Sequence, residues 1–319
     1  MAVGESDRQQ AAVHLRAGLA PPLQEIFDLL WSKKALGSSV RLRTTAAFLT
    51  RFARQADATS AGALLDRLRQ VRQLLTDDWP YQAALLNGTA WLLVVPLHNE
   101  PEIAQVQTEL EERYSCLLET CQQAKQRIAT FLANILGVVE TVLVHDYSST
   151  VMDALQYCAG CGQKLSVYAT VCHAARSDGE RVVHEAASFG HEARIVDDLA
   201  AGTLLATGEV DMLLIGADAV LASGELINTT GTLPLAITAH YFRVPVYCPT
   251  ELMKLSIPSV YGQALASRRT VESITEVYSP LFDVTPGEFV HAYVTESGLI
   301  PPASFSAAAR QHVLVAELL

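Results

Sequence analysis

The spacing of apolar residues predicts that the first part of the chain is helical. Apolar residues recur at three- and four-residue intervals over 43–56, 61–76 and about 102–136, which is the periodicity of helices that bury one face. Pro101 precedes the longest run and Gly137 follows it, as expected at the first turn and at the end of a helix. Turns are predicted at Trp79, Pro80, Asn87, Gly88 and Pro96.

After Gly137 the pattern changes to short apolar segments that alternate with helical ones. Strands are predicted at 139–145, 165–170, 193–196, 212–215 and 244–248, and helices near 149–160, 179–189, 199–207 and 231–242. This alternation is typical of right-handed βαβ units and of a doubly wound parallel sheet. We therefore predict an α/β fold, with an N-terminal helical domain at 1–138 and a Rossmann-like domain at 139–319.

Composition and charge exclude several classes of protein. Half of the 319 residues are hydrophobic and 18% are charged, which is enough for a large buried core. The net charge is −11 and no basic run exceeds two residues, so direct nucleic-acid binding is not expected. The strongest apolar runs, 91–97 and 212–215, are far shorter than the ~20 residues that span a bilayer. Without a secretory pattern at the first residues, we expect a cytoplasmic protein that does not bind a membrane.

Polar residues follow three of the predicted strands, at the edge where doubly wound sheets bind ligands. The first group is His145 with Ser148 and Ser149, which open the next helix. Hydroxyl groups at a helix start cap free backbone N–H groups, and the same groups can hold a phosphate. No glycine-rich dinucleotide motif or P-loop follows any of these strands, and we expect neither a cofactor nor a metal.

The second and third groups follow the strands at 212–215 and 244–248. Asp218 comes directly after an apolar strand, where burial would raise its pKa toward a value useful for proton transfer. Alternatively, Asp218 accepts backbone N–H bonds from the following loop. Asn228, Gly231 and Thr232 then open the next helix. Lys254 follows the third strand, where it either closes a pocket or lies along the surface.

Three stretches resemble one known family. They are Gly216–Asp218 with Asn228 and Gly231–Thr232, the region around His145–Val151, and 278–286 running on to 295–301. The chain resembles the family that joins the alpha, beta and delta subunits of translation initiation factor 2B with two isomerases, of methylthioribose 1-phosphate and of ribose 1,5-bisphosphate. The resemblance implies a helical domain, a Rossmann-like domain and a pocket between them. It also implies that the isomerases convert an aldose 1-phosphate into a ketose 1-phosphate, using a cysteine and an aspartate without a cofactor.

Two residues depart from the isomerase pattern. The family aspartate corresponds to Asp218, but Asp146 stands at the position of the cysteine. Thr229 stands where the signature has a lysine, which removes one cation from a phosphate site. Arg176 is similar to a family arginine, although its register is shifted. These departures favour a non-catalytic regulatory or assembly subunit of a guanine-nucleotide exchange complex. The alternative is a sugar-phosphate isomerase in which Asp146 and Asp218 move protons; Asp146 could also cap the next helix.

The resemblance also suggests ligand contacts and partners. Arg41 and Arg43 lie in a predicted loop that opens a helix, and this segment is similar to an arginine loop with which the isomerases reach their substrate. Solvated surface arginines are the other interpretation. A phosphorylated sugar or a nucleoside monophosphate is the expected ligand. We expect a homodimer with 283–302 near the contact, within a larger hetero-oligomeric complex if partner subunits exist.

Overall fold

The computed structural model describes residues 5–32, 37–96, 101–175, 178–263 and 280–319. Contacts group the chain into two units, residues 1–120 and residues 121–317, and the division falls within the longest helix. The boundary expected from the sequence was later, at 138. Arg176, Tyr278 and Ser279, which contributed to the family resemblance, lie outside the described residues.

The first unit is built from helices, as predicted. They are α1 (Glu5–Ala17), α2 (Pro21–Trp31), α3 (Ser38–Gln55), α4 (Ala61–Thr76), α5 (Ala83–Leu92) and the first part of α6 (Ile103–Leu136). Their apolar faces meet around Phe27 and Phe48, whose ring centroids are 6.0 Å apart and whose side chains are both almost fully buried. The predicted helices at 43–56, 61–76 and 102–136 correspond to α3, α4 and α6.

Two local predictions in this unit are wrong. Asn87 and Gly88 lie within α5 rather than in a turn, because both are buried in the core of the unit and packing overrides their local preference. The segment that carries Arg41 and Arg43 is not a loop. α3 begins at Ser38, so both arginines belong to the helix itself.

A seven-stranded sheet forms the centre of the second unit. Its order is β10–β9–β7–β4–β1–β2–β3, and every neighbouring pair is parallel except β10 with β9. The strands are β1 (Thr141–His145), β2 (Ser166–Thr170), β3 (Glu192–Val196), β4 (Met212–Ile215), β7 (Val246–Pro249), β9 (Ala292–Thr295) and β10 (Gly298–Ile300). The five strands predicted from the sequence are β1, β2, β3, β4 and β7, so the doubly wound parallel sheet is confirmed.

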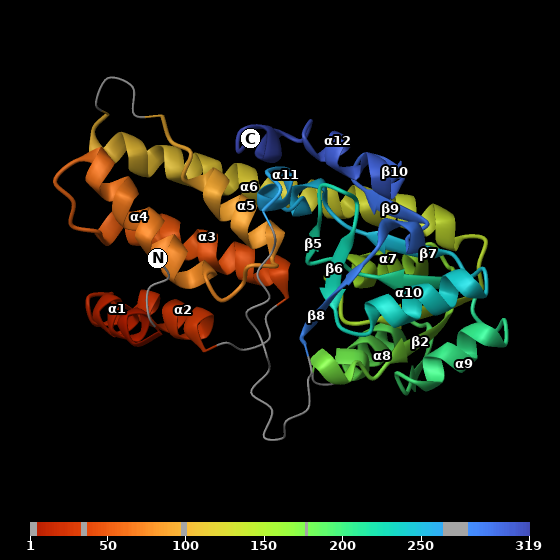
Figure 1. Ribbon diagram of the computed structural model, residues 1–319. Coiled ribbons are helices and arrows are strands. Elements are labelled where there is room, and N and C mark those ends of the chain that lie inside the picture. The colour runs from red at the N-terminus through yellow and green to blue at the C-terminus, as the bar shows by residue number, and fades with distance from the viewer. Residues whose placement is uncertain (1–4, 33–36, 97–100, 176–177, 264–279) are drawn as a thin grey trace. The chain divides into compact units, whose positions relative to one another are not determined.

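Helices cover both faces of this sheet because alternate strand residues point to opposite sides. Val142 and Val144 of β1 pack with the second part of α6, α7 (Ser149–Gly160) and α8 (Asp178–Ser188). Leu143 packs on the other side with α9 (Ala200–Ala206), α10 (Thr232–Tyr241) and α12 (Phe305–Ala309). Figure 1 shows α9 and α10 beside one another on this second face.

A small antiparallel sheet was not predicted. It has the order β5–β6–β8, formed by β5 (Ala219–Val220), β6 (Leu226–Thr229) and β8 (Phe282–Thr285). β5 directly follows the end of β4, and β6 ends at Thr229, so this sheet fixes the loop after β4. The remaining short elements are η1 (His173–Ala175), η2 (Leu252–Lys254), α11 (Ile257–Val260), η3 (Gly287–Phe289), η4 (Pro302–Ser304) and α13 (Val313–Ala316).

The strand order reverses at β1 and β4, and we call the carboxyl ends of these two strands the crevice. The chain runs outward from β1 through β2 to β3, and then returns to β4 on the other side of β1. Such a reversal leaves a gap at the carboxyl ends of the two central strands, which is where open α/β sheets bind ligands. Asp146 is the first residue after β1, and Asp218 is the third residue after β4. Both acids therefore lie at this gap.

Candidate acidic site at the strand ends

Asp146 is held in place by both of its carboxylate oxygens. The Thr229 hydroxyl donates to Oδ2 at 2.5 Å, and the backbone N–H of Tyr147 donates to Oδ1 at 2.7 Å. The backbone of Asp146 is left-handed, with φ of 67°, a conformation that aspartate tolerates better than most residues. The two positions that depart from the isomerase pattern are therefore bonded to each other. Asp146 does not cap α7, because the N-cap is Ser148.

A second carboxyl group, which the sequence pattern did not reveal, contacts Asp146. Asp178 begins α8, and its hydrogen-bonding contact with Asp146 lowers the pKa of Asp146 and raises the pKa of Asp178. Burial raises the pKa of both, and the Asp146 charge helps to bring the pKa of Asp178 to about 6. Gly179 allows this approach, because a Cβ atom there would lie 1.8 Å from the Thr170 carbonyl oxygen. In the sequence, the signal for this contact was the Asp178-Gly179 pair at the start of a predicted helix.

Asp218 is the third acid at the crevice. Its backbone N–H donates to Ile227 O at 2.9 Å, which joins the end of β4 to β6. Burial and then the Asp146 charge raise the pKa of Asp218 to about 7, although the Lys254 ammonium opposes this shift. A carboxyl group with this pKa exchanges its proton near neutral pH, which general acid–base catalysis requires.

Lys254 is buried beside these acids. Its Nζ donates to the carbonyl oxygen of Ala217 at 2.9 Å and lies 3.1 Å from Oε2 of Glu251. Only 4% of the residue is exposed, so the surface interpretation of Lys254 is wrong. The prediction that it binds a ligand stays a prediction.

Both ring nitrogens of His145 contact neighbouring residues, and its imidazole is neutral. Its Nδ1 lies 2.7 Å from the Thr170 hydroxyl and its Nε2 lies 3.3 Å from the carbonyl oxygen of Thr230. Burial lowers the pKa of His145. Gly231, with φ of 112°, packs against the ring, where a Cβ atom would lie 2.7 Å from it. His145 thus links the ends of β1 and β2 to the start of α10.

The N-terminus of α7 is capped by its own side chains. The Ser148 hydroxyl accepts the backbone N–H of Val151 at 3.4 Å. The Lys125 ammonium donates to the Ser149 hydroxyl at 3.1 Å and lies 3.3 Å from a carboxylate oxygen of Asp153. The capping interpretation of Ser148 therefore has a specific geometry, whereas phosphate binding by Ser148 and Ser149 stays a prediction.

The N-terminus of α10 is satisfied by a residue that the sequence pattern did not single out. Oδ2 of Asp283, from β8, accepts the backbone N–H groups of Gly231 and Leu233 at 2.9 and 3.0 Å. Asn228 donates to the Thr232 hydroxyl at 3.0 Å, and that hydroxyl donates to the carbonyl oxygen of Thr229 at 2.7 Å. Asp283 therefore accepts hydrogen bonds from the backbone N–H groups that would otherwise attract an anion. A ligand role for Asn228, Gly231 and Thr232 stays a prediction.

The two arginines of the first unit have different environments. Arg41 is 1% exposed, its guanidinium lies 3.5 Å from the Trp79 ring centroid, and its Nη1 donates to Leu30 O at 3.3 Å. Arg43 is exposed. Surface solvation therefore describes Arg43 and not Arg41. Ligand binding by either arginine stays a prediction.

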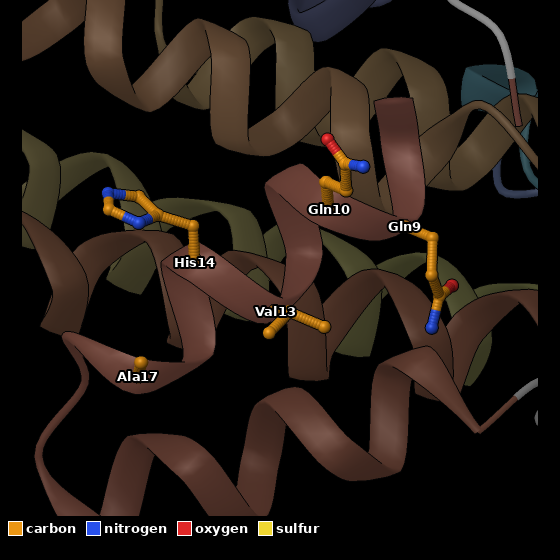
Figure 2. A pocket seen from close by; sticks show the side chains of 5 residues that line it. All are labelled: Gln9, Gln10, Val13, His14 and Ala17. Carbon is orange, nitrogen blue, oxygen red and sulfur yellow. The ribbon is translucent and has the colours of Figure 1, made fainter. Parts of the chain in front are cut away.

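Among the described residues, no group of three or more His, Cys, Asp or Glu side chains is arranged to hold a metal ion. None of the described helices is both long enough and apolar enough to cross a membrane. An open hollow of about 370 Å³ lies on α1 and contains none of the predicted site residues. Figure 2 shows the side chains that line it, which are Gln9, Gln10, Val13, His14 and Ala17.

The fold and the strand-end acids define an α/β protein with a polar site at the switch point of a doubly wound sheet. The model of the Initiation factor 2 subunit family matches residues 34–302, and the chain belongs to this family. A ribose 1,5-bisphosphate isomerase from Methanocaldococcus jannaschii is 23% identical over 290 residues, covering 88% of this chain and 92% of that protein.

Solved structures from the same family share the fold. A structure of translation initiation factor eIF-2B from Pyrococcus horikoshii has a TM-score of 0.76 at 23% identity, covering 89% of this chain and 98% of that chain. The tetrameric eIF2B-beta2-delta2 complex from Chaetomium thermophilum has a TM-score of 0.66 at 16% identity, covering 96% of this chain and all of that chain. The family therefore includes isomerases and initiation-factor subunits, and the chain is similar to both.

Proposed function

We propose that this chain is a non-catalytic regulatory or assembly subunit of the initiation factor 2B type. The hydrogen bond between Thr229 and Asp146 carries this proposal, because it joins the two positions at which the chain departs from the isomerase pattern. Asp146 uses one oxygen for Thr229 and the other for the Tyr147 amide. A carboxylate held in this way connects the loop after β1 to the end of β6, which is a structural role.

The charges at the crevice support the same proposal. Asp146, Asp178 and Asp218 lie together, and the buried Lys254 is already paired with Glu251. A sugar phosphate brings two further negative charges, which such a site repels unless cations are supplied elsewhere. Thr229 supplies none. A phosphorylated sugar or a nucleoside monophosphate would therefore need cations other than Lys254 to hold it.

The proposed partners follow from the family. We propose that the chain forms a dimer in the cytoplasm, with 283–302 near the contact, and joins a hetero-oligomeric guanine-nucleotide exchange complex. The Chaetomium thermophilum complex is a tetramer of two kinds of subunit, which supports association between family members.

The test combines a reaction assay with an assembly assay. Purified protein is incubated with methylthioribose 1-phosphate or ribose 1,5-bisphosphate, and proton NMR follows the appearance of ketose signals. Native mass spectrometry then measures the mass of the chain alone and after co-expression with the other family members of its host. The proposal expects no ketose and a defined hetero-oligomer. Ketose formation that is lost in Asp218→Asn would refute it.

One observation favours isomerase activity as a second candidate. The pKa of Asp218, at about 7, suits the transfer of a proton between C1 and C2 of an aldose phosphate. In this mechanism Asp146, which is held by Thr229, would orient the substrate hydroxyl while Asp218 moves the proton. The same NMR assay tests it, and a rate that follows the ionisation of one group near pH 7 would support it.

A further inference from the structure

A buried glutamate that follows β9 holds the turn after β7. Both carboxylate oxygens of Glu296 lie 3.2 Å from the backbone nitrogen of Leu252, the first residue of η2. Leu252 is 3% exposed and Glu296 is 9% exposed. Because this N–H group is buried, the loss of the Glu296 oxygens would leave a buried donor unsatisfied.

The same turn carries Lys254, whose charge acts on Asp218. Lys254 ends η2, and its Nζ donates to Ala217 O, one residue before Asp218. Glu251, which precedes η2, holds the same ammonium at 3.1 Å. A continuous set of contacts therefore runs from Glu296 through η2 to the residue that precedes Asp218.

We propose that Glu296 is a positioning residue that fixes η2 and thereby holds the Lys254 ammonium beside Asp218. The proposal goes beyond the proposed function, because it concerns how an ionisable group of the crevice is controlled whether or not the crevice carries out a reaction. It assigns a role to a residue that contacts neither Asp218 nor Asp146 in the described hydrogen bonds.

The surroundings of Glu296 indicate that it acts through hydrogen bonding more than through charge. Burial and the neighbouring Glu251 charge raise the pKa of Glu296 to about 7, and Arg127 opposes this shift. Nε2 of His312, which precedes α13, lies 3.5 Å from Oε1. A protonated carboxyl group still accepts the Leu252 N–H through its carbonyl oxygen. A glutamine at this position keeps such an oxygen, whereas a methionine of similar size does not.

The experiment compares Glu296→Met, Glu296→Gln and Glu288→Gln in the full-length chain. Glu288 is exposed and serves as the matched control. Carbon-13 NMR of labelled aspartate carboxyl groups follows the ionisation midpoint of Asp218, which is assigned by its absence in Asp218→Asn. Hydrogen exchange follows the Leu252 amide. We expect Glu296→Met to raise the Asp218 midpoint by about half a pH unit or more, because Lys254 loses its fixed position, and to speed exchange by about tenfold or more.

The remaining variants separate positioning from general destabilisation. Glu296→Gln and Glu288→Gln are expected to keep the wild-type midpoint and exchange rate. Lys254→Met is expected to raise the midpoint, and Glu296→Met is expected to add nothing in that background. Glu296→Asp, which keeps a shortened carboxylate, gives an intermediate midpoint and replaces Glu296→Met if that variant does not fold. An unchanged Asp218 midpoint in Glu296→Met, or the same rise in Glu296→Gln, would overturn the proposal.

Discussion

Replacing Asp218 by asparagine is expected to stabilise the protein at alkaline pH. Asparagine keeps the size of the side chain and the backbone bond to Ile227, but it removes the ionisation of a buried carboxyl group. Burial and the Asp146 charge raise the pKa of Asp218 from 3.8 to about 7 in the folded state. The unfolded chain therefore ionises first, so this group contributes stability at low pH that is lost as the pH rises from about 4 to about 7.

The magnitude follows from the size of this shift. Three pKa units correspond to about 4 kcal/mol of ionisation penalty once the pH exceeds the folded pKa. Water entry and relaxation around a half-buried carboxylate reduce the penalty, and we expect Asp218→Asn to gain about 2 kcal/mol at pH 8. At pH 4 the group is protonated in the fold and only about half ionised in the unfolded chain, so the variant is expected to lie within about 0.6 kcal/mol of the wild type.

Urea unfolding followed by circular dichroism at both pH values measures this difference. All three tryptophans lie in residues 1–120, so tryptophan fluorescence would not report directly on the unit that contains Asp218. Glu180→Gln, at an exposed position on α8, is the control for the loss of one negative charge. An Asp218→Asn variant whose free energy of unfolding differs from that of the wild type equally at pH 4 and pH 8 would refute the reasoning.

Two further substitutions test the geometry around Asp146 and α8. Thr229→Val removes the hydroxyl that donates to Asp146. It is expected to lower the free energy of unfolding by about 1–3 kcal/mol and to raise the pKa of Asp146. Thr229→Ser keeps the hydroxyl and is the control, and an equal loss of stability in both variants would contradict the hydrogen-bond argument. Gly179→Ala places a Cβ atom 1.8 Å from the Thr170 carbonyl oxygen, and a loss of about 2 kcal/mol or more is expected in thermal unfolding. Gly190→Ala is the control, because its Cβ atom would meet nothing within 4 Å although φ is 100° there. It is expected to lower the stability by only about 1 kcal/mol. A larger loss in Gly190→Ala than in Gly179→Ala would count against the steric explanation.

Periodicity predicted the main elements because their burial is regular. β4 is continuously apolar, β1 has the apolar centre 142–144, and α3, α4 and α6 each present an apolar stripe. Both patterns are visible within a short window of sequence. The small sheet was missed because β5 has only two residues, and β8 pairs with β6 across a long stretch of sequence.

The candidate site was only partly predictable for a similar reason. Asp146 and Asp218 follow apolar strands, so their position at the crevice could be inferred from topology alone. Asp178 and Asp283 reach the site through contacts with residues far away in the sequence, and apart from the Asp-Gly pair at Asp178 no local pattern distinguishes them from surface acids. Arg41 could not be predicted either. Its guanidinium is buried against Trp79, whereas most arginines are exposed.

The pairing of β1 with β4 has a consequence for the kinetics of folding. Thr141 and Asp211, which join the starts of these strands, are 70 residues apart in the sequence, and contacts of such long range form slowly. Asp218 meets Asp146 only after this pairing, so the repulsion between these two acids is absent from early species. A change in their charge should therefore appear mainly in the unfolding rate constant, and the folding rate constant should remain nearly independent of pH between about 5 and 8.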